Sequence, residues 1–183
     1  MKTFFHGIRA SRPCAPGRAG IAALAVLLAG AALGGACKLL DLYTVYLGDI
    51  FSQISVWILL CSALCLYSPN PLQAGVRVFA FCIGMLAAYY AVAEGTGSVY
   101  SMTFVQGWLA VCCAAPWLAG LVWYAGGRGW FARALGAGVL LAALGLEILL
   151  FDKLRVWDIL LDAVLGILLF QRPGSSREKK AGE

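Results

Sequence analysis

The chain has 183 residues, of which 62% are hydrophobic and only 13% are charged, and its formal net charge is +5. Its apolar residues form long blocks, such as residues 21–36 and 74–92, which a soluble protein would expose as large apolar patches. The positive charges lie in short segments between these blocks, which favours the lipid bilayer and argues against a nucleic-acid partner. Because a transmembrane helix needs about 20 mainly apolar residues, we expect an all-α fold: a polytopic, integral membrane helical bundle.

The chain is expected to begin with a basic cytoplasmic segment over residues 1–18, followed by the first span. Small residues precede Cys37, so this span also looks like a secretory signal with a lipoprotein cleavage site. Gly34 stands where such a site has Leu or a similar residue, which favours an uncleaved helix, although cleavage stays open. Residues 38–53 mix acids and tyrosines with aliphatic residues, and we expect them to lie along the outer interface.

Prolines and glycines divide the rest of the chain. The turn Ser68–Pro71 should end the second span, because proline cannot continue a helix, and Pro116 is expected to break the fourth. A basic cytoplasmic tail is expected over residues 171–183. Six spans result, over about 19–37, 50–67, 74–93, 102–124, 130–151 and 156–170.

The distribution of basic residues predicts the orientation. Short loops rich in Lys and Arg stay in the cytoplasm. Only Lys38, Lys153 and Arg155 lie on the outer side of the six-span arrangement. The other 11 of the 14 basic residues lie on the side of the N-terminus: Lys2, Arg9, Arg12, Arg18, Arg77, Arg128, Arg133, Arg172, Arg177, Lys179 and Lys180. Both termini are therefore expected in the cytoplasm of a bacterial cell, with the protein in the cell membrane.

The acidic residues have the opposite distribution and suggest a site. Ionisable groups inside a span are costly, so they normally face the bundle or water and are functional candidates. Asp158 and Asp162 are four residues apart and share one helix face, whereas Glu147 needs either the outer interface or a partner such as Lys153 or Arg155. The candidate residues are Glu147, Asp158, Asp162, Arg155, Glu94 and Asp49. Two interpretations stay open, namely a structural ion network and a binding site for a solute or ion.

Small residues recur at four-residue spacing in two spans. Gly30 and Gly34 form a GxxxG pair in the first, and Ala134, Gly138 and Ala142 repeat in the fifth. Such spacing lets helices approach closely, either within the bundle or against another membrane protein. Internal packing is favoured, and a partner interface stays open.

No cofactor or metal is expected. The seven cysteines lie mostly inside apolar blocks, where we interpret them as packing residues, and no histidine lies in a span. The sequence shows no phosphate-binding glycine loop, no HExxH helix and no serine elbow. Catalysis by a familiar hydrolytic or metal mechanism is therefore not expected.

Residues 52–130 resemble a group of small, functionally uncharacterised multi-span membrane proteins of Gram-positive bacteria. The matching pieces are S-x-W at Ser55–Trp57, the Ser68–Pro69 turn, F-x-x-G-M-x-x-x-Y-Y at Phe81–Tyr90 and W-Y-A-x-G at Trp123–Gly127. This resemblance implies no known activity. The last span looks faintly like the closing helix of the VanZ-like family, with Asp162 where that pattern has Asn.

These features favour a small membrane protein without catalysis that binds a solute or serves as a membrane subunit of a transporter. Substrate-capture subunits of energy-coupling-factor transporters are similar in size and span number, and by that analogy Ala25, Ala29, Gly30 and Gly34 would dock a coupling subunit. A structural or regulatory membrane partner without a ligand is the alternative. An enzyme that modifies lipids or the envelope, using Glu147, Asp158 or Asp162, is a further one.

Overall fold

The computed structural model describes residues 8–44, 53–151 and 155–170, and within these residues it is an all-helical bundle. Its helices are α2 (Pro16–Tyr43), α4 (Ile54–Leu66), α5 (Pro71–Gly95), α6 (Met102–Ala125), α7 (Trp130–Phe151) and α8 (Val156–Phe170). Four helical segments are long and apolar enough to cross a membrane, namely α2, α5, α6 and Trp130–Leu149 of α7. The expected all-α bundle of apolar helices is confirmed at this level.

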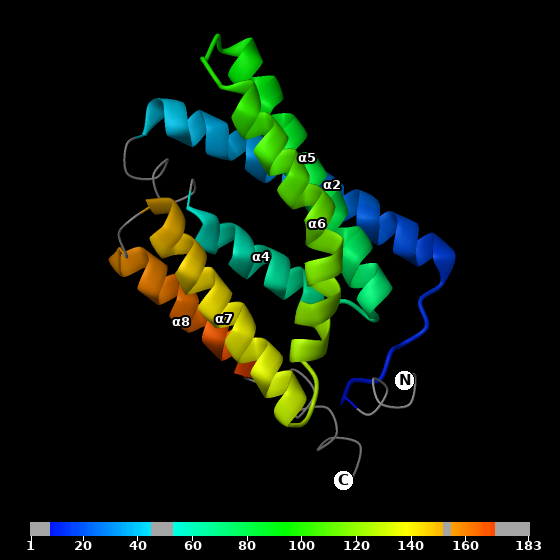
Figure 1. The fold of residues 1–183 in the computed structure, drawn as a ribbon. Helices are drawn as coiled ribbons and strands as arrows, with labels where there is room; N and C mark the ends of the chain where they lie inside the picture. The colour runs from blue at the N-terminus through cyan, green and yellow to red at the C-terminus, as the bar shows by residue number, and fades with distance from the viewer. Residues whose placement is uncertain (1–7, 45–52, 152–154, 171–183) are drawn as a thin grey trace.

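Helix α4 is the centre of the bundle. It contacts α5 and α6 on one side and α7 and α8 on the other, while α2 packs mainly against α5. Figure 1 shows successive helices running in alternating directions, so the start of α4, the end of α7 and the start of α8 lie at the same end of the bundle.

The turn between α4 and α5 agrees with the sequence. Helix α4 ends at Leu66, and Pro71 occupies the first turn of α5, where its missing N–H costs nothing. The Asn70 side chain caps α5 by accepting a hydrogen bond from the Gln73 backbone nitrogen at 2.8 Å. Helix α5 therefore begins three residues before the expected start at Ala74.

Two helices differ from the sequence prediction. Helix α2 continues through Tyr43, beyond the expected end of the first span at residue 37. Lys38 supports this extension through an ion pair with Asp41 (Nζ–Oδ2 3.0 Å), and the Thr44 hydroxyl donates to the Leu40 carbonyl oxygen. Helix α6 is also continuous across Pro116, because a membrane helix tolerates the loss of one backbone hydrogen bond when neighbouring helices support it.

The contact between α2 and α5 depends on glycine. A Cβ atom on Gly30 would overlap the carbonyl oxygen of Phe81, and one on Gly34 would overlap that of Met85. From the other side, a Cβ on Gly84 would meet the carbonyl oxygen of Leu27. The GxxxG pair in α2 therefore packs within this chain, which lets the two backbones touch. Gly30 and Gly34 are buried by this contact and do not form an open docking surface.

The basic N-terminal flank is tied to the bundle through Arg9. Its Nη1 donates to the Trp123 carbonyl oxygen at 2.8 Å and its Nη2 to the Leu66 carbonyl oxygen at 2.6 Å. The guanidinium carbon also lies 4.4 Å from the centre of the Trp123 ring. Arg9 thus supplies positive charge and donors at the C-terminal ends of both α4 and α6, where carbonyl groups lack helical partners.

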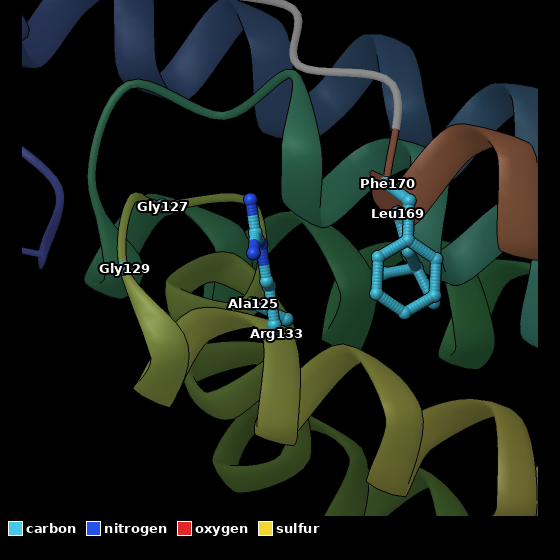
Figure 2. A pocket seen from close by; sticks show the side chains of 6 residues that line it. All are labelled: Ala125, Gly127, Gly129, Arg133, Leu169 and Phe170. Atoms are coloured by element: carbon cyan, nitrogen blue, oxygen red, sulfur yellow. The ribbon is translucent and has the colours of Figure 1, made fainter.

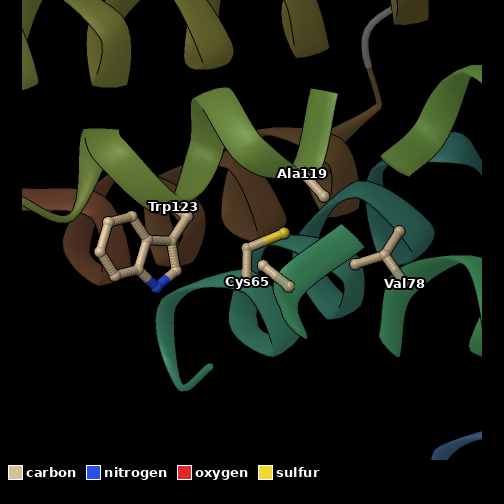
Figure 3. Packing of buried hydrophobic residues seen from close by; sticks show 5 residues of the cluster. Cys65, Val78, Ala119 and Trp123 are labelled. Atoms are coloured by element: carbon tan, nitrogen blue, oxygen red, sulfur yellow. The ribbon is translucent and has the colours of Figure 1, made fainter. Parts of the chain in front are cut away.

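Two apolar clusters fill the bundle. Figure 3 shows the first, in which Cys65, Val78, Ala119 and Trp123 pack together between α4, α5 and α6. The Trp123 ring is fully buried, and its Nε1 donates to the Ser68 carbonyl oxygen at 2.9 Å. The second cluster joins α4, α6, α7 and α8 through Leu66, Ala125, Ala143, Leu165 and Leu169.

We expect Gly34→Leu to destabilise the protein by about 2 kcal/mol or more, because the added side chain forces α2 away from α5. Thermal unfolding in detergent measures the loss. Gly138→Leu is the matched control, since a Cβ at Gly138 meets nothing within 4 Å, and its expected change is within about 0.5 kcal/mol. Equal losses in both variants would contradict the glycine contact.

Candidate ligand-binding site

Three helix ends bring polar side chains together inside the apolar bundle. Ser55 lies in the first turn of α4, Glu147 in the last turns of α7, and Asp158 and Asp162 in the first two turns of α8. All are buried, and Glu147 is only 1% exposed. The N-termini of α4 and α8 add partial positive charge near these acids. We call this group, with Gln53 and Arg155, the acidic site.

Asp158 is fully engaged by its neighbours. Its carboxylate accepts a hydrogen bond from the Ser55 hydroxyl at 3.2 Å and one from the Arg155 backbone nitrogen at 2.9 Å. The Gln53 amide fits best with its nitrogen toward Asp158, to which it then donates, while its oxygen accepts from Arg155 Nη1 at 3.1 Å. Asp158 therefore holds the ends of α4 and α8 together and has a structural role.

The carboxyl groups of Glu147 and Asp162 differ from that of Asp158 in their hydrogen bonding. Glu147 lies opposite Asp162 and Ser55, but the single Ser55 proton is already donated to Asp158. Within residues 8–44, 53–151 and 155–170, none of the four carboxyl oxygens of Glu147 and Asp162 has a hydrogen-bond partner. Asp162 is only 6% exposed, so its carboxyl group has little access to the surface. Two buried carboxyl groups that face each other need a proton or a positively charged ligand.

The floor of the acidic site is apolar. Ala143 lies one helical turn before Glu147 on α7, and Leu165 follows Asp162 on α8; both belong to the second apolar cluster. This packing closes the site toward the opposite end of the bundle. The low dielectric of such surroundings strengthens the attraction between the acids and a cation.

The remaining candidates are placed differently. Arg155 joins the acidic site through its backbone and its guanidinium group, as described above. Glu94 is exposed near the C-terminal end of α5, an end that Figure 1 shows away from α7 and α8. Asp49 and Lys153 lie outside the described residues, as do the whole expected tail over residues 171–183 and the first seven residues.

Sequence reasoning missed Gln53 and Ser55. Both are uncharged, and both are buried at the start of α4 (4% and 2% exposed). The available signal in the sequence was weak, since it consisted only of two polar residues at the beginning of an apolar span. Both residues matter because they contact Asp158, which lies more than 100 residues further along the chain.

The three small residues that recur at four-residue spacing in α7 lie on its outer surface. Ala134, Gly138 and Ala142 are all exposed, so nothing in the described part of the chain covers them. At the end of α7 that lies opposite the acidic site, a small pocket of about 60 Å³ opens between the turn at 126–129 and the end of α8. Figure 2 shows Arg133 of α7 on one side of this pocket, with Leu169 and Phe170 of α8 on the other.

Four of the seven cysteines, Cys61, Cys65, Cys82 and Cys112, lie close together between α4, α5 and α6. The Cys61 and Cys82 sulfurs are 3.9 Å apart, which is a contact and not a disulfide bond. Among the described residues, no three or more His, Cys, Asp or Glu side chains are arranged to hold a metal ion.

Comparisons with known proteins find no match for this chain. No protein-family model, no curated protein and no solved structure matches it.

We expect substitutions to separate Asp158 from Glu147. Asp158→Ala should destabilise the ligand-free protein by about 2 kcal/mol or more, because it leaves buried donors without an acceptor. Glu147→Gln should leave the stability unchanged or raise it, because it removes a buried, unpaired carboxyl charge. Thermal unfolding in detergent at neutral pH compares the two. A loss in Glu147→Gln as large as in Asp158→Ala would mean that Glu147 has a structural partner.

Proposed function

We propose that this protein is a small bacterial cell-membrane protein that binds a cationic solute or ion at Glu147 and Asp162, alone or as the membrane subunit of a transporter. The observation that carries the proposal is the pair of buried carboxyl side chains whose oxygens have no partner among the described residues. A structural ion network would pair these groups, as it pairs Asp158. An ionisable residue that is buried in a membrane bundle without a partner is a functional candidate by default.

The chemistry of the pair indicates the kind of ligand. Carboxylates are acceptors only, so the missing partner is a donor or a positive charge. The Asp158 side chain, although nearby, is already satisfied by Ser55, Gln53 and Arg155. Two free carboxyl groups suit a proton, an alkali-metal ion or a small ammonium compound. No step of bond making or breaking is required of the site.

The proposed topology has six spans with both termini in the cytoplasm. The alternating helix directions in Figure 1 support it, as does the excess of Lys and Arg at the end of the bundle where α5 and α7 begin. In this orientation the acidic site lies near the outer surface. A solute could therefore reach Glu147 and Asp162 from outside the cell.

The first experiment is a thermal-shift screen of the purified protein against alkali-metal ions and small ammonium compounds. A ligand at 100 times its Kd stabilises by about 2.7 kcal/mol, which corresponds to roughly 5–10 °C for a chain of this size. We expect one class of cation to raise the melting temperature of the wild type. The rise should disappear in Glu147→Gln and in Asp162→Asn.

Glu94→Gln is the matched control, because it removes an acid that is exposed near the end of α5. It should keep the full cation response. The proposal fails if no cation stabilises the wild type and Glu147→Gln lowers the melting temperature, because the acids would then be structural. Turnover of a lipid precursor that Asp162→Asn abolishes would instead support an enzyme.

The topology is tested with reporter fusions. A reporter that is active only outside the cell, fused at Ser98 between α5 and α6, should be active, and the same reporter at Gly127 or after Glu183 should be inactive. A cytoplasmic reporter should give the opposite pattern. Activity of the external reporter after Glu183 would contradict the even number of spans.

A membrane partner is a second candidate function, favoured by the exposed face of α7. One face of that helix carries Ala134, Gly138 and Ala142, which no described residue covers. Small residues permit close contact with another helix. This candidate is compatible with a transporter subunit. The coupling-subunit analogy through α2 is weaker, because Gly30 and Gly34 face α5.

A further inference from the structure

A third ionisable side chain without a partner among the described residues, Arg77, lines a groove far along the chain from the acidic site. The groove has a volume of about 230 Å³ and an almost wholly apolar lining. Helices α2, α4 and α5 form its walls. Its lining residues are Val26, Ala29, Leu60, Ala63, Leu64, Tyr67, Arg77 and Phe81.

The groove has a polar end and an apolar end. Leu60, Leu64 and Tyr67 follow one another along α4 toward its C-terminus, over about 10 Å at 1.5 Å per residue. On α5, which runs back in the opposite direction, Arg77 lies near the start and Phe81 one turn further into the bundle. Tyr67 and Arg77 therefore mark the end near the turn at 67–70, and the rest of the groove is hydrocarbon-like.

Arg77 has no partner in the described part of the chain. Its Nε is buried and makes no hydrogen bond there, and no ion pair involves its guanidinium group. Arg9, by comparison, donates to two carbonyl oxygens and lies over the Trp123 ring. A buried guanidinium N–H without an acceptor is costly, so a ligand that supplies an anionic acceptor would stabilise Arg77.

We propose that this groove binds one anionic phospholipid, with an acyl chain along Leu60, Ala63 and Phe81 and the phosphate at Arg77. The apolar lining matches an acyl chain, and the single charged residue of the lining is opposite in sign to a phosphate. Arginine presents a planar set of donors that fits phosphate oxygens. The groove is too small for a helix, which is about 10 Å across, so a lipid fits it better than a second protein.

The proposed orientation places the start of α5 on the cytoplasmic side, so the lipid would belong to the cytoplasmic leaflet. The cytoplasmic leaflet carries anionic lipids, and basic pockets between membrane helices on that side bind their headgroups. The lipid would fill the gap between α2 and α4 beside the glycine contact of α2 with α5. This site is separate from the acidic site, so the lipid proposal does not depend on cation binding.

The test measures binding of two lipids with the same acyl chains to the full-length protein in detergent, by native mass spectrometry and by thermal shift. Phosphatidylglycerol should bind the wild type at least tenfold more tightly than phosphatidylcholine and should raise its melting temperature. Arg77→Gln should reduce the phosphatidylglycerol affinity at least tenfold and remove the preference. Arg77→Lys should keep part of the preference, because it retains the charge and loses the planar donor set.

Arg18→Gln is the matched control, since Arg18 is an exposed arginine at the same end of the bundle and should leave the lipid preference unchanged. Ala63→Phe, which fills the groove without changing charge, should also weaken phosphatidylglycerol binding. If Ala63→Phe does not fold, the comparison of Arg77→Gln with Arg18→Gln decides. Inorganic phosphate alone should produce no shift.

Three outcomes would overturn the proposal. Equal affinity of the wild type for both lipids would show that Arg77 does not select a headgroup with a net negative charge. Equal loss in Arg77→Gln and Arg18→Gln would show a general effect of surface charge. A shift with inorganic phosphate as large as that with phosphatidylglycerol would indicate a free-anion site and exclude the acyl chain as a determinant.

Discussion

A polar group inside an apolar helical bundle must find its partner within the protein, because hydrocarbon offers no hydrogen bonds. Most polar groups of this protein meet the requirement at helix ends. Arg9 bonds the carbonyl oxygens of Leu66 and Trp123, and the Trp123 ring nitrogen bonds Ser68. At the opposite end of the bundle, Asp158 collects donors from Ser55, Gln53 and the backbone of Arg155.

A few buried side chains are exceptions to this requirement. Within the described residues, the carboxyl groups of Glu147 and Asp162 and the amide oxygen of Gln73 lack donors, and the Arg77 Nε lacks an acceptor. The two kinds of site are opposite in charge and lie toward opposite ends of α4, near its start and near its end. The central position of α4, which contacts α5, α6, α7 and α8, means that both sites share one structural helix.

Close helix contact and polar pairing support each other in this bundle. Glycine at positions 30, 34 and 84 brings the α2 and α5 backbones together, and the apolar groove that Arg77 lines opens beside that contact, where α4 meets the pair. Gly126 and Gly127 leave space under residues 8 and 9, so that Arg9 reaches the ends of α4 and α6. Small residues thus act in two ways: they let helices touch, and they let a charged side chain reach carbonyl groups.

The sequence alone predicted the helical class and the approximate bounds of the apolar helices, because these depend on composition and on the length of apolar blocks. Four of these helices are long and apolar enough to cross a membrane. The bounds of α7 and α8 agree with the expected residues 130–151 and 156–170. Local pattern misjudged Pro116, because support from neighbouring helices decides whether a helix continues past a proline. It also missed the extension of α2 through Tyr43, although the Lys38–Asp41 pair within that extension is local. Only the tertiary structure decided which polar residues are satisfied: Asp158 and Asp162 look alike in sequence, yet donors from α4 reach only the first. The physical reason is that a hydrogen bond depends on distances of about 3 Å between segments far apart in the chain, and neither spacing nor composition encodes those distances.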